Sequence, residues 1–365
     1  MGQLPIIIIG AGISGLSLAK ALVDKGQAVL VVEAGKVGSG ASGAAAAYLE
    51  PRTGTGGLRA IEWESLKRWP AYAQHVAEST GTDLDYRTEG LIHVAREDGL
   101  PRLQREFEQR QAAGTPVTWL SGDEAREREP ALSPDILAGY SLHQVHTLDA
   151  RAFCAAMAAL LVQMGVEVSE ETHVLSITTD GDELLLHTSR GERRAAKVVL
   201  CCAMGRNHIE GLPDDVPLSR PVRGVMLDLA EDEGPPLVSR MVKHSKGVIC
   251  PRTGGRLLVG PTSEKGETSL LVDDDVIAGL LETAGQFVPA VAKLDRTNIL
   301  VGIRALTGDG ALKLGQSRAV PGVYYSLSHG GSGFLRAPVV AEELADYLLN
   351  EAASCPLTSA YLTRL

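Results

Sequence analysis

Three glycines near the start of the chain have the spacing of a dinucleotide-phosphate site. Gly10, Gly12 and Gly15 form a GxGxxG pattern, and Glu33 follows further along. The first glycine permits a tight turn, the second lets backbone approach a pyrophosphate, and the third lets a helix pack closely on its strand. Amides at the start of that helix favour phosphate, and Glu33 can accept hydrogen bonds from ribose hydroxyls. The pattern therefore predicts a bound dinucleotide, with a ligand-free glycine-rich turn as the alternative.

The surrounding residues predict the strand–helix–strand unit that such a site requires. Residues 4–9 are a short β-branched run without alternation, which is typical of a buried parallel strand. Residues 16–25 carry apolar side chains at helical spacing, and Gly26 ends that helix. Residues 28–32 predict a second buried strand, which ends at Glu33.

Two further segments of small residues bear on which dinucleotide is bound. Residues 38–47 are nearly all Gly, Ala and Ser, which lets backbone run beside a large flat ligand. The sequence His-Gly-Gly-Ser-Gly at 329–333 leads into a long helix expected over 337–350. The dipole of that helix would stabilise negative charge on a reduced flavin. Both segments favour FAD over NAD, while a flexible loop and a flexible helix entry are the alternatives.

The other segments predict a second, interleaved part of the molecule. Residues 57–140 are rich in Glu, Arg and Gln at helical spacing, and residues 220–262 predict short antiparallel strands between Gly and Pro. No linker separates these parts from the nucleotide-binding segments. We therefore predict an α/β protein in which a Rossmann-like FAD-binding domain (1–56, 141–219 and 300–365) is interleaved with a substrate-binding domain (57–140 and 220–299) built on an antiparallel sheet.

Composition and charge argue against nucleic-acid, membrane and metal binding. A chain of 365 residues suffices for about two domains. Its net charge of −10 and the absence of Lys/Arg runs argue against nucleic acid. Apolar runs are too short to cross a membrane, and no signal-peptide pattern is present, so we expect a cytoplasmic protein. Five irregularly spaced cysteines predict neither a disulfide framework nor a metal site, and a homo-oligomer stays open.

Several segments, in a fixed order, carry a resemblance to a known family. They are the glycine pattern, GASGAAAAYLEPR at 40–52, VVLCCAMG at 198–205, RPVRGVML at 220–227, GVICPRTGGRLLVGPT at 247–262, VGIRALTGDGALKLG at 301–315 and SHGGSGFLRAP at 328–338. Through them nearly the whole chain resembles the D-amino-acid oxidase superfamily, and within it the glycine oxidases of thiamine biosynthesis. The oxidase domain of the bifunctional enzyme that modifies tRNA wobble uridine is also similar.

The resemblance implies that FAD is bound without a covalent link, because no cysteine stands clearly at the family's covalent flavin position. It places contacts to FAD in the glycine pattern, at Glu33, in the small-residue loop, at one later strand and at the entry of the last helix. The residues concerned are Gly10, Gly12, Ile13, Ser14, Gly15, Glu33, Ala34, Ala41, Ser42, Ala46, Ala47, Tyr48, Val174, Gly330, Gly331, Ser332, Gly333, Phe334 and Leu335.

The resemblance also implies a substrate site. Arg304 stands at the family's carboxylate-binding arginine, and a guanidinium suits bidentate binding of a carboxylate; an ordinary ion pair is the alternative. Tyr48 would lie over the flavin, and His329 is a catalytic candidate if it reaches the flavin, with helix capping or packing as the alternative. Val248 replaces a substrate-contacting tyrosine of the glycine oxidases, and Gly331 replaces an arginine. The candidates to supply the missing polar contacts are Arg52, Arg223, His244, Lys246 and Arg336.

The reaction implied by the resemblance is oxidation of the C–N bond of a small amine or amino acid, such as glycine, a D-amino acid or an N-substituted glycine. Hydride passes from the α-carbon to flavin N5, water hydrolyses the imine, and oxygen reoxidises the flavin. The substrate reacts as a neutral amine, so we assign no general base. Two alternatives stay open: an NAD-dependent dehydrogenase that uses the same glycine pattern, and a flavin-containing tRNA-modification module.

Overall fold

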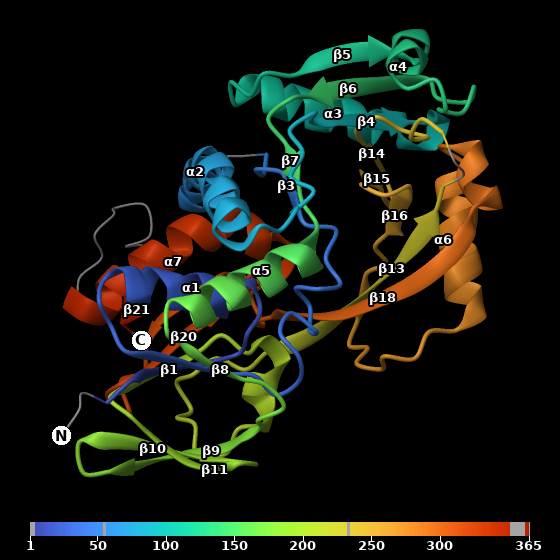
Figure 1. The fold of residues 1–365 in the computed structure, drawn as a ribbon. Coiled ribbons are helices and arrows are strands. Elements are labelled where there is room, and N and C mark those ends of the chain that lie inside the picture. Colours follow the sequence, from blue (N-terminus) through green and yellow to red (C-terminus); the bar gives the residue numbers. More distant parts are fainter. Residues whose placement is uncertain (1–3, 54–55, 232–233, 351–361, 365) are drawn as a thin grey trace.

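Two β-sheets organise the molecule, and segments from distant parts of the sequence contribute to each (Figure 1). The computed structural model describes residues 4–53, 56–231, 234–350 and 362–364. Cys355 lies outside these ranges. The four described cysteines have free thiols.

The first sheet contains the predicted strand–helix–strand unit. Strand β1 pairs in parallel with β2 on one side and with β12 on the other, and α1 (Ile13–Asp24) connects β1 to β2. This confirms the predicted α/β class at the start of the chain. The strand order is β21 (Leu362–Arg364), β19 (Lys313–Gln316), β20 (Val323–Leu327), β12 (Lys197–Leu200), β1 (Ile6–Ile9), β2 (Val29–Val32) and β8 (Glu167–Ser169).

Side chains on β1 point alternately to two cores, as strand geometry requires. Ile6 and Ile8 pack with α1, α5 (Ala150–Gln163) and α7 (Gly333–Asn350). Ile7 and Ile9 pack on the opposite face, which a three-stranded sheet covers. Figure 1 shows the helices and this small sheet on opposite sides of β1. The small sheet consists of β9 (Val174–Asp180), β10 (Glu183–Thr188) and β11 (Gly191–Ala195).

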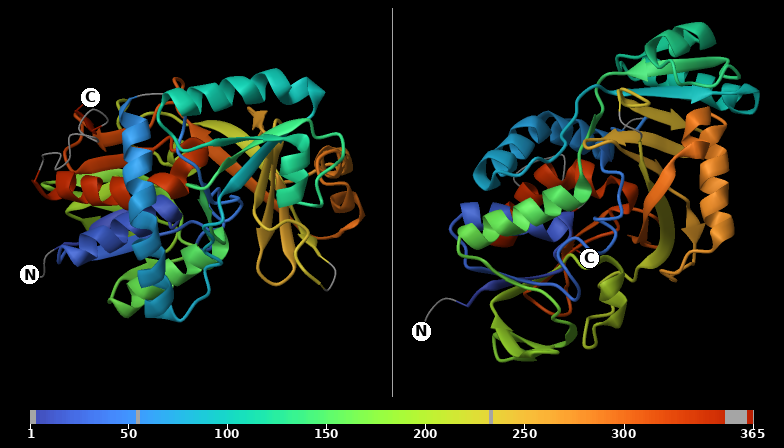
Figure 2. Two further views of the ribbon diagram at one scale, coloured as in Figure 1. Left: turned by 90° about the horizontal axis from the view of Figure 1, so that it is seen from above. Right: turned by 45° about the vertical axis from the view of Figure 1, so that its right-hand side comes forward.

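The second sheet is mostly antiparallel, as predicted for 220–262, and its two faces differ in role. On β13, Val225 and Leu227 pack towards α6 (Asp274–Gly285), whereas Met226 packs towards Tyr48 and the small-residue loop. Figure 2 shows α6 on the outer side of this sheet. The strands are β17 (Glu264–Lys265), β13 (Arg220–Ala230), β16 (Arg256–Gly260), β15 (Gly247–Arg252), β14 (Met241–His244), β4 (Leu91–Ala95), β6 (Ala138–Leu142) and β5 (Thr118–Ser121), in this order, and β18 (Asp295–Leu306) pairs with β13.

Shorter elements join and flank the two sheets. Strand β3 (Tyr48–Leu49) pairs with β7 (His146–Thr147), at the junction of the two parts (Figure 1). Single 3₁₀ turns precede α3, follow β12, follow α6 and precede α7. The remaining elements are α2 (Gly57–Thr80), α3 (Leu100–Ala112), α4 (Gly122–Arg128) and the 3₁₀ turns at 97–99, 203–208, 289–293 and 330–332.

Helix α2 packs against helices of the FAD-binding part, although the expected division of the chain places residues 57–140 in the substrate-binding domain. It packs on α7 and α5, where the Trp69 indole N–H donates to the Phe334 carbonyl at 3.1 Å. The Tyr72 hydroxyl lies 2.8 Å from the Ser17 hydroxyl of α1. Apart from the buried Glu62, the charged side chains of α2 are at least partly exposed and do not indicate which core the helix covers. We therefore propose that α2 belongs to the FAD-binding part. We also propose that the domain boundary does not lie at residue 300, because β18 continues through that position.

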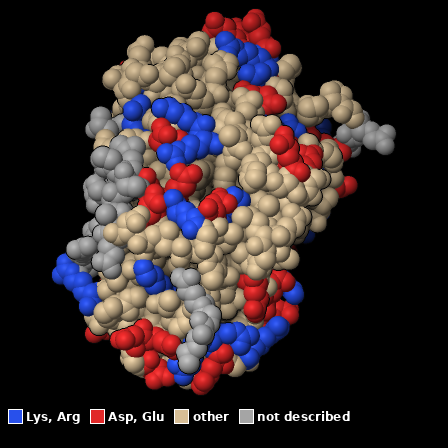
Figure 3. Space-filling model, turned by 60° about the vertical axis from the view of Figure 1, so that its left-hand side comes forward, with Lys and Arg blue, Asp and Glu red and all other residues tan. Residues whose placement is uncertain are grey.

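Surface charges of both signs are mixed on the face that Figure 3 shows. On the face in Figure 3, Lys and Arg side chains lie next to Asp and Glu side chains. This face therefore lacks the extended positive surface that attracts nucleic acid. Within the described ranges, no helix combines the length and the apolar character that a membrane span requires.

Candidate active site

The glycine pattern lies where β1 turns into α1, and close packing explains its glycines. Gly10 has a φ of 109°, and a Cβ there would lie 2.7 Å from the Cys201 carbonyl oxygen. A Cβ on Gly15 would lie 1.9 Å from the Gly10 carbonyl oxygen, so any side chain would push α1 away from the turn. A Cβ on Gly12 would lie 2.9 Å from the Ser42 hydroxyl oxygen. The backbone at Gly12 therefore remains accessible to a ligand.

Glu33 is held in a fixed orientation beside this turn. One of its carboxylate oxygens accepts a hydrogen bond from the Ala11 amide at 2.7 Å, and the other accepts from the Gly35 amide at 2.8 Å. Each oxygen can accept a second hydrogen bond. Glu33 lines a cavity of about 540 Å³, and it can accept there from a ligand's hydroxyl groups.

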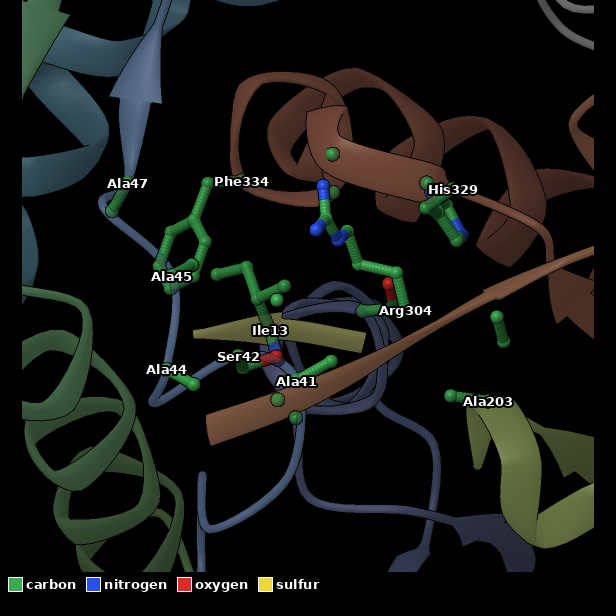
Figure 4. A pocket seen from close by; sticks show the side chains of 18 of the residues that line it. Ile13, Ala41, Ser42, Ala44, Ala45, Ala47, Ala203, Arg304, His329 and Phe334 are labelled. Carbon is green, nitrogen blue, oxygen red and sulfur yellow. The ribbon is translucent and has the colours of Figure 1, made fainter. Parts of the chain in front are cut away.

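A second cavity, of about 170 Å³, continues from the first past the same turn. Gly12, Ala41 and Ser42 line both cavities, so the two form one elongated space. Figure 4 shows the small side chains of Ala44 and Ala45 at one side of the second cavity. The turn before α7 closes another side. The cavity is therefore bounded largely by backbone and methyl groups, which suits a flat ring system.

The residues predicted to contact FAD come together around these spaces, with one exception. Gly15 lies behind the turn, in contact with Gly10, and lines no cavity. A third, polar cavity adjoins the second one. Gly10, Glu33, Ala34 and Val174 line the first cavity; Ile13, Ser14, Ala46, Ala47, Tyr48, Gly330, Gly331, Gly333 and Phe334 line the second; and Ser332 and Leu335 line the third.

Arg304 projects from β18 into the second cavity (Figure 4). One nitrogen, Nη2, donates to the Thr262 carbonyl at 2.7 Å and to the Arg223 carbonyl at 3.2 Å. Within the described ranges no carboxylate pairs with Arg304, so the ion pair that was its alternative role is absent there. Burial lowers the pKa of Arg304 and neighbouring Tyr48 raises it, but a guanidinium stays charged at any physiological pH. A partly buried cation without an acidic partner is thus directed at the cavity.

His329 and Tyr48 are both uncharged at neutral pH. Burial, assisted by the charge of Arg336, lowers the pKa of His329 to about 3. Its Nε2 lies 2.9 Å from the Ser326 hydroxyl, and its carbonyl accepts from Arg336 at 3.1 Å. These contacts favour the packing role for His329. Burial raises the pKa of Tyr48, which lines the second and third cavities.

The five candidates to replace missing polar contacts do not assemble. Arg52 lines the third cavity, whereas Arg223 pairs with Glu264 at 3.0 Å. The others line neither the second nor the third cavity: His244 stacks on Phe287, Lys246 is exposed, and Arg336 pairs with Glu62.

Sequence reasoning missed other residues that line these cavities. Met226 and Pro261 bound the second cavity, and Lys243 and Arg110 bound the third. Lys243 offers one sequence signal, because it is a charged residue directly after the apolar pair Met241 and Val242 in a short strand. No sequence pattern predicts that Lys243 pairs with Glu50 in the N-terminal part of the chain.

Comparison with known proteins identifies the family. Residues 5–347 match the family of FAD dependent oxidoreductases. The chain belongs to this family. FAD is therefore its cofactor, which removes the NAD alternative, and the resemblance inferred from the sequence is confirmed. The elongated space fits this cofactor, because Glu33 lies at one end and the turn before α7 lies at the other.

Individual members of the family are similar over their full length. Glycine oxidase of Geobacillus kaustophilus (strain HTA426) is 30% identical over 366 residues, which cover 98% of this chain and 96% of that protein. A crystal structure of glycine oxidase from Geobacillus kaustophilus has a TM-score of 0.92 at 28% identity, with 100% of both chains covered. That of glycine oxidase from Bacillus cereus ATCC 14579 has a TM-score of 0.91 at 26% identity, covering 100% of this chain and 99% of the other.

We expect Gly12→Ala to weaken FAD binding at least roughly tenfold, because the new Cβ would lie 2.9 Å from the Ser42 hydroxyl oxygen and displace the loop that lines both cavities beside this turn. The dissociation constant measured by flavin fluorescence on reconstitution of the apoprotein checks this. Gly279→Ala is the control, since a Cβ at Gly279 in α6 would have no atom within 4 Å. An unchanged dissociation constant for Gly12→Ala would mean that FAD does not cross this turn.

Proposed function

We propose that this FAD-dependent oxidoreductase oxidises the C–N bond of a small amino acid, such as glycine, a D-amino acid or an N-substituted glycine. The observation that carries the proposal is Arg304, whose guanidinium faces the second cavity without a described carboxylate partner. A substrate carboxylate supplies that partner, and a bidentate Arg–carboxylate pair also fixes orientation. The similarity to glycine oxidases supports the same substrate class.

Arg304 can orient the substrate so that its α-carbon faces the flavin ring. FAD supplies a two-electron acceptor when bound. The α-carbon loses hydride and the nitrogen loses a proton, which leaves an imine; water then cleaves the C=N bond to a carbonyl compound and an amine or ammonia. Oxygen is the proposed final acceptor and becomes hydrogen peroxide. The small, largely apolar cavity excludes bulk water from the reacting carbon.

Anaerobic reduction of the bound flavin tests the proposal. The purified holoenzyme is mixed with glycine, D-alanine, sarcosine and an amine that lacks a carboxylate. We expect bleaching of the flavin absorbance by carboxylate-bearing amines and little by the amine alone. If no amino acid of this panel reduces the flavin, the substrate class is wrong. Tight binding of tRNA at physiological salt would favour the tRNA-modification alternative instead.

The pH dependence of kcat/KM should report the substrate and not the protein. His329 has a pKa of about 3 because of burial and Arg336, and burial raises that of Tyr48 above its usual value. Neither group changes charge between about pH 6 and 9, so kcat/KM should rise with pH as the substrate amine loses its proton. Two substrates whose amines differ in pKa should give correspondingly displaced profiles. A rise at the same pH for both would point to a titrating group in the protein.

A further inference from the structure

The polar third cavity, of about 360 Å³, adjoins the cavity that Arg304 faces. Tyr48 and Gly331 line both. A Cβ on Gly331 would have no atom within 4 Å, so the boundary between the two spaces is open at that residue. Across the β14–β15 ladder, the short side chain of Val248 stands opposite Lys243 and leaves the lysine room to reach the loop after β3. A substrate held by Arg304 can thus extend past Tyr48.

One side of the third cavity carries more positive than negative charge. Lys243 Nζ lies 2.6 and 2.8 Å from the two carboxylate oxygens of Glu50. Arg110 donates to the same carboxylate, and its side chain is only 4% exposed. Two cations therefore share one carboxylate. Arg110 Nε is also buried and has no hydrogen-bond partner among the described residues.

On the other side of the cavity, Arg52 has a buried carboxylate as its partner. The fully buried Glu62 accepts from Arg52 Nε at 2.8 Å. It also accepts from Arg336 Nε at 3.0 Å and Nη2 at 2.8 Å. Arg52, which lines the cavity, is therefore paired with a buried carboxylate.

The remaining acid of the cavity is already balanced. Glu106 accepts from Arg102 Nε at 2.9 Å. His93 lies near it but is neutral, because burial and the charge of Lys243 hold its pKa well below the usual value. Four cations (Arg52, Arg102, Arg110 and Lys243) thus stand against three carboxylates (Glu50, Glu62 and Glu106), an excess of one positive charge in this group.

We propose that this cavity binds a second carboxylate of the substrate, so that the enzyme prefers amino acids with two carboxylates. The proposal rests on the proposed function, since Arg304 binds the first carboxylate. The reacting carbon and nitrogen lie between the two anionic groups. D-aspartate, D-glutamate and iminodiacetate, a glycine with a carboxymethyl group on nitrogen, have this chemistry. Lys243, which shares Glu50 with Arg110, is the side chain that determines the specificity.

Matched acids and amides test the preference in the wild-type holoenzyme. We expect kcat/KM for flavin reduction to be at least roughly tenfold higher with D-glutamate than with D-glutamine, and with D-aspartate than with D-asparagine. Equal or higher values with both amides overturn the proposal. If neither member of a pair reduces the flavin and glycine and sarcosine also fail, the proposed function fails first.

Ligand binding tests the second-carboxylate site independently of the proposed reaction, because it requires no turnover. Succinate should perturb the flavin absorbance with a dissociation constant at least roughly tenfold lower than that of its monoamide, succinamate. Similar constants for the two ligands overturn the second-carboxylate site, whatever the turnover results are.

A variant identifies the residue responsible. Lys243→Gln removes one excess charge and leaves Glu50 paired with Arg110. We expect it to lower kcat/KM for D-glutamate roughly 10- to 100-fold and to leave that for D-glutamine within about twofold. Lys243→Arg should restore most of the preference. Lys20→Gln is the matched control, because Lys20 is partly buried on α1 and pairs with Asp24 at 2.6 Å. An equal loss for acid and amide in Lys243→Gln would assign Lys243 a structural role and overturn this assignment; if the variant does not fold, the succinate comparison decides.

Discussion

Arg304→Ala should raise KM for amino-acid substrates roughly 30- to 900-fold, which corresponds to about 2–4 kcal/mol of lost charge-assisted hydrogen bonding. The physical reason is that the guanidinium is partly buried and has no acidic partner among the described residues, so a bound carboxylate is its counter-ion. Steady-state kinetics with glycine or the best substrate of the panel provides the measurement.

Two controls make this expectation specific to the carboxylate. Arg304 also donates to two backbone carbonyls, so its removal could disturb the fold and loosen FAD. The first control is therefore the flavin absorbance of Arg304→Ala, which should equal that of the wild type. An amine without a carboxylate should react at a similar rate in both proteins. A KM within about twofold of the wild-type value for amino acids would remove Arg304 from the substrate site.

Glu62→Gln should lower the free energy of unfolding by about 3–5 kcal/mol, the usual cost of breaking a buried ion pair. Glu62 is fully buried, and the side chain of its partner Arg336 is only 2% exposed, so the substitution removes the negative charge of a buried ion pair. Arg336 also donates to the His329 carbonyl, at the turn before α7. We therefore expect weaker retention of FAD as well. Thermal unfolding of the holoenzyme, followed by flavin fluorescence, measures both effects.

An exposed ion pair provides the comparison. Glu183→Gln removes one of the two carboxylate partners of Arg194, the other being Asp180, and the side chains of Arg194 and Glu183 are at least 40% exposed. Exposed pairs contribute about 0–1 kcal/mol, so its unfolding temperature should remain close to that of the wild type. A similar small change for Glu62→Gln would show that α2 and α7 are not held together by this pair.

Local patterns in the sequence predict the first half of the site well. The turn at Gly10, Gly12 and Gly15 depends on contacts within one strand–helix–strand unit, so the spacing of the glycines is sufficient to locate it. Glu33 at the end of β2 belongs to the same unit. Each element is short and its partners are near in sequence, which is why these predictions agree with the structure.

Long-range placement was predicted less well. The charge pattern of α2 indicates an amphipathic helix, yet only the contacts of Trp69 with the start of α7 decide which core it covers. Of five candidate polar residues, only Arg52 reaches the cavities near the flavin ring. Whether an arginine faces a ligand or pairs with a buried acid depends on neighbours from other strands, which periodicity does not encode.

By itself, the sequence determined the glycine-rich turn, the α/β class and the family, because the glycine pattern and the ordered family segments are properties of the chain alone. Only the tertiary structure decided how charge is distributed around the substrate space. Lys243 from β14 and Arg110 from α3 meet Glu50 of the N-terminal loop, although they are far apart in the sequence. That meeting is set by how β3 and the second sheet pack together. The proposed preference for two carboxylates therefore depends on the fold and not on any local sequence pattern.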